Sequence, residues 1–331
     1  MEKLTFSGSP HIRCKLTTKQ IMLDVVIALL PACVVGCVIF GLQALLILCI
    51  AAVAAVVTEI VYNLIFNKMK FKETLKAFDF TSLVTGVLIG MNMPPRVEWY
   101  VPLLASIFAI AVVKMLFGGT GKNLFNPAIA GRIFAFLSFT AMMTKAENYA
   151  AGSIILQSGA TPLTDLLNTG STGSITILQM FIGDIPGCIG ETSAAALIIG
   201  GIYLAIRGVI DLRFPAIFIA VAGLLSVAMN GFNWSLFLPS ILGGGLMLGA
   251  IFMATDYVTT PNTKLANYIY FACLGLLTVI LRYSKATDRI EACSFAIMMM
   301  NITVPLFDKF FVKKPFGFVK VKKLKKEDAK K

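Results

Sequence analysis

Ten apolar stretches separated by polar segments dominate the pattern of the chain. Because the hydrocarbon core of a bilayer is about 30 Å thick, a helix needs about 20 mostly apolar residues to cross it. The third, fifth, seventh and tenth stretches are short, which is typical of tilted or broken helices inside a bundle. The pattern predicts an all-α polytopic membrane bundle of about ten transmembrane helices, at residues 21–40, 42–66, 80–93, 100–117, 128–143, 192–210, 215–229, 238–253, 265–281 and 293–307.

The composition agrees with a membrane protein and excludes an ordinary soluble domain. Hydrophobic residues make up 57% of the 331 residues and charged residues only 14%, whereas about 25% of a soluble domain is charged. The first apolar stretch begins at Ile21, after a polar segment that carries Arg13, Lys15 and Lys19. A cleaved signal peptide has a much shorter charged head, so we expect this first stretch to be retained as a helix.

The distribution of basic residues predicts how the helices are oriented. If residues 1–20 form a cytoplasmic arm, the cytoplasmic segments hold 22 Lys and Arg residues and the outer loops hold five. Because cytoplasmic loops carry an excess of Lys and Arg, we expect both termini in the cytoplasm and the loop 144–191 outside. The basic tail 312–331 contributes much of the net charge of +12. We interpret this tail as a contact with anionic membrane lipid and not with nucleic acid.

Five predicted helices precede the outer loop and five follow it. With an odd number in each half, the second half enters the membrane from the opposite side, which is an inverted-topology repeat. We therefore predict two inverted five-helix halves, 21–143 and 192–311, joined by the loop 144–191. Each half contains a helix that closes on a proline turn, at residues 93–95 and 254–261, before an apolar helix with aromatic residues near its start.

Several ionisable residues lie inside or at the ends of the predicted helices, where a charge is costly. Most are close enough to an end for the charged group to reach the membrane surface. Lys114 and Arg132 lie within neighbouring helices, and Asp79 and Asp256 are their candidate partners.

Independent catalytic sites and metal sites are not predicted. Cys33 and Cys37 are spaced i, i+4, but no second pair follows at ligand spacing, so we interpret them as small apolar residues. The single histidine, His11, cannot form a metal site alone. No paired general acid and base or nucleophile triad indicates an independent hydrolytic enzyme.

The polar stretch Ser158-Gly159-Ala160-Thr161-Pro162 lies within the long interval between the two predicted halves. Gly159 and Ala160 have little side-chain bulk and Pro162 prevents a helix from continuing, so the Thr161 hydroxyl is expected to be sterically open. One interpretation is an ordinary surface loop. The other is that Thr161 is a modification site.

A glycine-rich turn at residues 118–127 precedes the fifth predicted helix. It is not a nucleotide P-loop, because the required order of Gly, Lys and Ser or Thr is missing. Its amides, Asn123 and Asn126, lie one turn apart at a helix start, where amides and backbone N–H groups suit the acceptors of a planar heterocycle. Ordinary helix capping is the alternative.

Glu191 and Thr192 stand at the start of the sixth predicted helix, within Gly190-Glu191-Thr192-Ser193. They are interpreted first as part of a helix N-terminus with its own cap residues. The second interpretation is that they face whatever group Thr161 carries.

These motifs together resemble the RnfD/NqrB family of membrane subunits, found in the Rnf ferredoxin:NAD oxidoreductase and in the sodium-pumping NADH:quinone reductase. The similarity runs over nearly the whole chain. Without the long N-terminal extension expected of the quinone reductase subunit, the chain looks more like the Rnf branch. The motifs that carry the resemblance are residues 79–86, 93–95, 121–132, 158–162, 190–193 and 252–261.

The resemblance implies two flavins in a protein of the bacterial plasma membrane. Thr161, the last residue of the Ser-Gly-Ala-Thr motif, would carry FMN through a phosphoester installed from FAD by a flavin transferase. Asn123 and Asn126 match the asparagines associated with a second, non-covalent riboflavin near the inner face. The other subunits of the Rnf-type complex would be the partners.

We therefore expect a flavin-carrying subunit that relays electrons while its complex moves Na⁺ or H⁺. The protein would supply position and electrostatics and the flavin the redox chemistry. A channel or secondary transporter for a small solute or ion is the alternative, and a membrane scaffold without a cofactor is a third possibility. The Ser-Gly-Ala-Thr loop around Thr161 distinguishes the three hypotheses, since only a flavoprotein requires such a loop.

Overall fold

The computed structural model describes residues 17–145, 166, 176–284 and 291–312. Throughout these residues the regular structure is helical, without strands, as the apolar pattern predicts. The candidate attachment stretch 158–162 lies outside the described residues. So do the tail from residue 313 onward and most of the predicted outer loop.

The helices before residue 146 begin with two long apolar ones and continue with shorter pieces. These elements are α1 (Thr18–Phe40), α2 (Leu42–Ile65), α3 (Phe71–Ala77), α4 (Thr81–Met91), α5 (Tyr100–Ile107), the π-helix η1 (Phe108–Met115), α6 (Pro127–Ser138) and α7 (Thr140–Met143).

The helices after residue 175 end with two long ones. These elements are α9 (Ile177–Ile182), α10 (Ala194–Ile206), α11 (Arg213–Met229), the 3-10 helix η3 (Trp234–Leu236), α12 (Phe237–Leu242), α13 (Leu246–Leu248), the π-helix η4 (Gly249–Met253), α14 (Lys264–Tyr283) and α15 (Ala292–Phe310).

Three helices, α1, α2 and α14, are long and apolar enough to cross a membrane, and two bent helix pairs bring the number to five. Shorter apolar helices account for other predicted spans. Large apolar side chains on the outside of the bundle are exposed, such as Val38 at 78% and Ile206 at 80%. In water such a surface would be unfavourable, so the chain is a polytopic helical membrane protein.

Two pairs of consecutive helices are sharply bent, and one of the bends lies inside a predicted span. The axes of α3 and α4 differ by 70°, and the axis of η3–α12 differs from that of α13–η4 by 67°. At the first break Phe80 has a positive φ of 64°, and at the second Gly245 has a φ of 62°. A left-handed residue stops the helical hydrogen-bond ladder. The short 80–93 stretch is therefore part of a broken helix as predicted, whereas the break inside 238–253 is not evident from the pattern.

The side chain of Arg282 stabilises the second break. Arg282 is 1% exposed, and its guanidinium donates to the carbonyl oxygens of Ser240 at 2.7 Å, Gly243 at 3.1 Å and Gly244 at 3.2 Å. The predicted span 265–281 left Arg282 outside the helix, which is wrong, because α14 extends to Tyr283 and buries this side chain. The carbonyl groups at the end of α12 are a favourable place for a cation.

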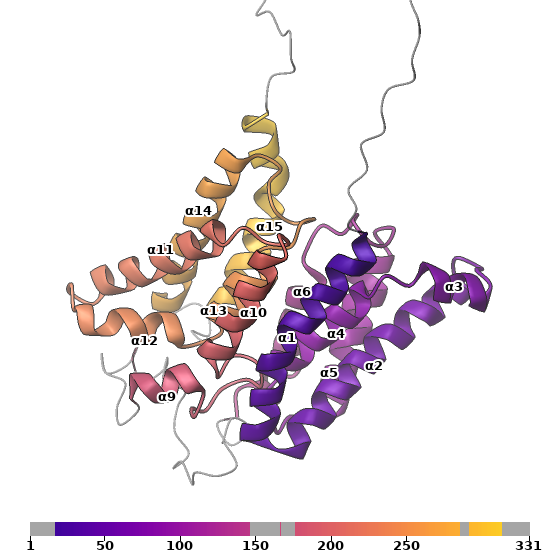
Figure 1. The fold of residues 1–331 in the computed structure, drawn as a ribbon, viewed down its shortest axis with the longest axis horizontal. Helices are drawn as coiled ribbons and strands as arrows, with labels where there is room; N and C mark the ends of the chain where they lie inside the picture. Colours follow the sequence, from indigo (N-terminus) through magenta and orange to yellow (C-terminus); the bar gives the residue numbers. More distant parts are fainter. Residues whose placement is uncertain (1–16, 146–165, 167–175, 285–290, 313–331) are drawn as a thin grey trace, which may run out of the picture.

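The two groups of helices pack along α1 and α10, which lie side by side (Figure 1). Gly200 makes this contact possible, since a Cβ on it would lie 2.2 Å from the backbone oxygen of Ala28. In Figure 1 the start of α1 and the end of α15 lie at one end of the bundle, and α9 lies at the other. We call these the termini end and the α9 end.

Candidate functional site

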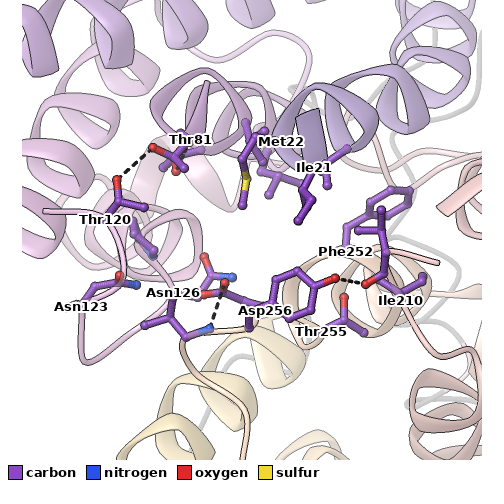
Figure 2. A pocket seen from close by; sticks show the side chains of 18 of the residues that line it. Ile21, Met22, Thr81, Thr120, Asn123, Asn126, Ile210, Phe252, Thr255 and Asp256 are labelled. Atoms are coloured by element: carbon purple, nitrogen blue, oxygen red, sulfur yellow. Dashed lines mark hydrogen bonds between the residues drawn. The ribbon is translucent and has the colours of Figure 1, made fainter. Parts of the chain in front are cut away.

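A cavity at the termini end opens where the two groups of helices meet, and we call it the asparagine pocket (Figure 2). Its volume is about 120 Å³, which corresponds to about four water molecules at the volume of liquid water. Asn123 and Asn126 both line it, so the structure brings together the two amides singled out in the sequence. The other walls come from α1, α4, η1, the end of α10, η4 and the segment after it.

Asn126 is the N-cap of α6, so the capping interpretation is confirmed. Its Oδ1 accepts from the backbone N–H of Ala128 at 2.9 Å, and Pro127 occupies the first helical position. Its Nδ2 donates to the backbone oxygen of Met253 at 2.9 Å, which ties the start of α6 to the end of η4. That nitrogen carries two hydrogens, and Met253 takes one of them. Capping and a place in the cavity wall are therefore compatible.

Asn123 lies in the glycine-rich turn and also lines the pocket. Its Nδ2 donates to the backbone oxygen of Phe125 at 2.9 Å, which fixes the amide within its own turn. Gly121 has a φ of 86°, and a Cβ there would meet nothing within 4 Å. This glycine is needed for its backbone conformation, because a side chain rarely adopts such a φ.

One wall of the pocket contains a buried ion pair. Lys114 Nζ lies 2.8 Å from Glu59 Oε1 of α2 and also donates to the hydroxyl of Thr81. Thr81 donates in turn to Asp79, which accepts a further bond from Thr120 at 3.0 Å. Asp79 therefore joins the break before α4 to the glycine-rich turn. The predicted partners of Lys114 were Asp79 and Asp256. Its direct ion-pair partner is Glu59, because η1 packs against α2, and Asp79 interacts with it through Thr81 and by charge.

Opposite this wall, Asp256 and Tyr257 close the pocket. Asp256 accepts hydrogen bonds from the backbone N–H of Val258 and the hydroxyl of Thr259. Burial raises the pKa of the Asp256 carboxyl, and those two hydrogen bonds oppose the shift. The Tyr257 hydroxyl donates to the backbone oxygen of Val209. Figure 2 shows Met22 of α1 and Asp256 on different sides of the same space.

Arg132 lies deeper, outside this pocket, in a second buried ion pair. Its Nε is 2.6 Å from Glu291 Oε2 and its Nη2 is 2.8 Å from Glu291 Oε1. Its Nη1 donates to Asn92. Neither predicted partner of Arg132 is correct, because the start of α15 packs against α6 and presents Glu291. This bidentate geometry is the strong form of an arginine–carboxylate contact.

Glu191 and Thr192 lie at the opposite end of α10 from the asparagine pocket. Ser193 is the N-cap of α10 and accepts from Ala196 at 3.3 Å, so this stretch is a capped helix start as predicted. Glu191 Oε1 accepts from the backbone N–H of Cys188 at 3.1 Å. Glu191 Oε2 and Thr192 Oγ1 are buried without a hydrogen-bond partner in the part of the chain that the structure describes. The candidate residues therefore form two separate groups, and Ser158, Gly159, Ala160 and Thr161 lie outside the described residues.

Sequence reasoning missed the wall contributed by the second group of helices. Val209, Ile251, Phe252 and Tyr257 line the pocket from segments more than 80 positions away from Asn126. The one local signal was the polar run 254–261 directly after an apolar helix, which the sequence marks as a turn. The long apolar helices make this chain a helical membrane protein. The cavity that its two groups of helices share is its candidate ligand site.

Comparison with known proteins gives the family. The model of the NQR2, RnfD, RnfE family matches residues 5–317, and the chain belongs to this family. It is 39% identical over 323 residues to the D component of the Na(+)-translocating ferredoxin:NAD(+) oxidoreductase complex of Acetobacterium woodii, covering 97% of each chain. It is 35% identical over 325 residues to the D component of the proton-translocating ferredoxin:NAD(+) oxidoreductase complex of Clostridium ljungdahlii, covering 95% of this chain and 96% of that one.

A more distant relative is named only by its general function. The chain is 30% identical over 339 residues to the D component of the ion-translocating oxidoreductase complex of Alcanivorax borkumensis, covering 95% of this chain and 97% of that one. The resemblance to the RnfD/NqrB family drawn from the motifs is thereby confirmed.

Proposed function

We propose that the chain is the flavin-carrying membrane subunit of an ion-translocating ferredoxin:NAD oxidoreductase complex, the counterpart of the D component in its relatives. It would relay electrons between the ferredoxin- and NAD-linked partner subunits while the complex moves an ion. The names of the relatives, which cover nearly the whole chain, support this role. Those names divide between sodium and protons, so the transported ion is Na⁺ or H⁺.

The observation that carries the proposal is the asparagine pocket, which we assign to a non-covalent riboflavin. Asn123 and Asn126 line it with amide N–H groups that can donate to the carbonyl and ring-nitrogen acceptors of a planar heterocycle. Met22 and Phe252 supply apolar surface for the ring faces. The lining therefore fits a flavin ring, with few polar groups in a mostly apolar cavity.

When bound, the flavin supplies the electron transfer, and the residues of this chain position it. Both polar atoms of the Asn126 side chain are hydrogen-bonded, Oδ1 to the backbone N–H of Ala128 and Nδ2 to the backbone oxygen of Met253. The amide is therefore preorganised. Lys114 presents a buried ammonium at the pocket wall, balanced by Glu59. A preorganised polar wall of this kind sets the electrostatic environment of a cofactor.

A covalent FMN on Thr161, attached by a flavin transferase, is the second part of the proposal. The motif Ser158-Gly159-Ala160-Thr161 supports it through its match to the family. Glu191 and Thr192, with unpartnered buried oxygens among the described residues at the α9 end, are the residues we propose to face this flavin. The two flavins would then stand at opposite ends of the bundle, so that the chain carries electrons across the membrane.

We further propose an architecture of about ten transmembrane helices in two inverted five-helix halves, 21–143 and 192–311. The bent pairs support it, since α3–α4 and η3–α12–α13–η4 each follow two apolar helices in their half. In this proposal the protein lies in the bacterial plasma membrane with the arm 1–20 and the tail 312–331 in the cytoplasm. The loop 144–191 lies outside, and the termini end faces the cytoplasm.

A secondary transporter without a redox cofactor is the second candidate, favoured by the same broken helices, which often form substrate sites in transporters. The flavin content of the purified complex decides between the two. Acid extraction should release one riboflavin per chain, and denaturing gel electrophoresis should retain fluorescence on the chain. A chain free of both flavins would exclude the proposed function and leave the transporter.

A further inference from the structure

The short helix α3 lies at the termini end of the bundle, next to the end of α2 (Figure 1). It follows α2 after a turn in which Lys68 has a positive φ of 50°, and it packs back against α2. Its axis differs from that of α4 by 70°. Because α2 is long and apolar enough to cross a membrane, α3 begins at the depth where the apolar part of the bundle ends.

One face of α3 is apolar and uncovered. Phe71 is 57% exposed and Leu75 is 48% exposed, and their i, i+4 spacing makes them neighbours on the helix surface. Phe66, just before the turn, is exposed as well. The buried residue of this helix is Thr74. The packing of α3 on the bundle therefore leaves its large apolar side chains free to contact something else.

The same segment is strongly basic. Residues 66–78 contain four lysines, Lys68, Lys70, Lys72 and Lys76, and one carboxylate, Glu73. All four lysines are exposed, and none of them forms an ion pair within the part of the chain that the structure describes. The positive charge of this surface is therefore not neutralised by the chain itself.

The basic and apolar residues alternate in a regular way around α3. Lys72 and Lys76 each follow an exposed apolar residue, Phe71 and Leu75, by one position, which is about 100° around the helix. The two lysines therefore flank the apolar face along one edge. A lysine in this position can cover apolar surface with its stem and extend its ammonium group toward water or a headgroup.

This arrangement favours a lipid surface over a protein partner. Short helices with exposed apolar residues on one face and lysines beside them lie in the boundary between headgroups and acyl chains. Clustered lysines next to a membrane-spanning helix attract anionic lipids. Lysine is depleted at the centres of protein–protein interfaces, so a surface with four exposed lysines is less suited to a partner subunit.

We propose that residues 66–78 form an interfacial segment that binds the headgroups of anionic phospholipids. Phe71 and Leu75 enter the boundary between headgroups and acyl chains, and the four lysines contact headgroup phosphates. The lipid contact depends on neither proposed flavin and on neither orientation of the chain. It requires only that the bilayer surface lies at the termini end.

A tryptophan reporter on α3 tests the lipid contact directly. The two tryptophans of the chain, Trp99 and Trp234, are replaced by phenylalanine, and Phe71→Trp is introduced. The full-length chain is reconstituted into mixed bilayers of phosphatidylglycerol and phosphatidylcholine, in two series with bromine on the upper acyl chains of one lipid or the other. Bromine quenches a tryptophan that it contacts, so both series should show quenching, and brominated phosphatidylglycerol should quench more strongly.

Charge variants in this reporter chain test the role of the lysines. Lys72→Gln with Lys76→Gln should lower the preference for phosphatidylglycerol by about fivefold or more, the effect of one lysine near an anionic surface. Lys264→Gln with Lys309→Gln removes the same charge from exposed lysines of α14 and α15 and should leave the preference unchanged. Raising the salt from about 0.1 M to about 1 M should lower the preference without any substitution, because the screening length falls from about 10 Å to about 3 Å.

Three results would overturn the proposal. An absence of quenching by either lipid would mean that α3 does not lie in the bilayer surface, which would leave this face to a partner protein. Equal quenching by the two lipids would mean an apolar contact without headgroup recognition. A preference that survives the loss of Lys72 and Lys76 and is also insensitive to salt would exclude the lysines as its cause. Circular dichroism of each variant, with unchanged helical content, shows that a lost preference does not come from unfolding.

Discussion

Lys114 and Glu59 form an ion pair between η1 and α2, with Nζ 2.8 Å from Oε1 and both side chains almost completely buried. The residues are 55 positions apart in the sequence. Breaking a buried pair by removing one partner leaves an uncompensated charge, whereas removing both partners is much less costly. The pair therefore has consequences for stability that a surface ion pair would not have.

The variant Lys114→Met should destabilise the bundle by about 3–5 kcal/mol. The double variant Glu59→Gln, Lys114→Met should recover a large part of that loss, because no buried charge remains. Both effects can be measured as denaturant- or heat-induced unfolding of the purified chain in detergent. Lys72→Met, on the exposed face of α3, is the matched control and should change the stability by less than about 0.5 kcal/mol. Equal stability of Lys114→Met and this control would contradict the prediction.

Asn126 has two separable roles, and substitutions can divide them. Asn126→Asp keeps the oxygen that caps α6 but removes the Nδ2 donor, while Asn126→Leu removes both. Both variants should lower the acid-extractable flavin per chain, with binding about 5- to 150-fold weaker. Only Asn126→Leu should also lose the cap, at a cost of about 0.5–2 kcal/mol in unfolding free energy. Full flavin release from Asn126→Asp would mean that the amide acts only as a cap.

Thr161→Ala should abolish the flavin fluorescence of the chain on a denaturing gel and leave the bundle folded, because the described helices pack without this residue and most single substitutions away from a core change stability little. Thr164→Ala, three positions later, is the control and should keep the fluorescence. Acid-extractable flavin should be unchanged in both variants, because the asparagine pocket is built from other residues. Fluorescence that survives Thr161→Ala and disappears in Thr164→Ala would move the attachment site to Thr164.

The proposed orientation can be tested by labelling single cysteines in a cysteine-free chain. A cysteine at Gln157 should react with an impermeant thiol reagent added outside intact cells, and a cysteine at Glu327 should react only after the membrane is opened. The prediction follows from the excess of basic residues in the cytoplasmic segments. The opposite pattern would invert the orientation and move the asparagine pocket to the outer face.

The long helices follow from the sequence, and the contacts between them do not. The predicted helices 21–40, 42–66 and 265–281 agree with α1, α2 and α14 to within a few residues, because uninterrupted apolar length is a local property. The break at Gly243 to Gly245 interrupts no apolar pattern, so hydropathy alone could not reveal it. Other predicted spans appear as shorter apolar helices, and the count of ten remains a prediction.

The sequence predicted only part of the site, because it shows local signals such as helix caps and does not show contacts between distant segments. Asn126 was found because a cap residue before Pro127 is a local signal, and the structure keeps both its capping and its pocket-lining character. The direct ion-pair partners of Lys114 and Arg132 were not predicted, although Asp79 does interact with Lys114 through Thr81. Glu291 lies 159 positions from Arg132, and Glu59 lies 55 positions from Lys114. Tertiary packing chooses between carboxylates that a one-dimensional pattern cannot rank.

The guanidinium of Arg282 also limits how the bundle can move. If α12 and α13 joined into one straight helix, the carbonyl groups of Ser240, Gly243 and Gly244 would be needed by backbone amides four residues later. Arg282 would then lose the three acceptors that it uses now, inside a site that water does not reach. Straightening this element would therefore weaken the contacts of a buried cation, which is unfavourable. A change between states that keeps these three hydrogen bonds would move groups of helices against each other and leave the bend unchanged.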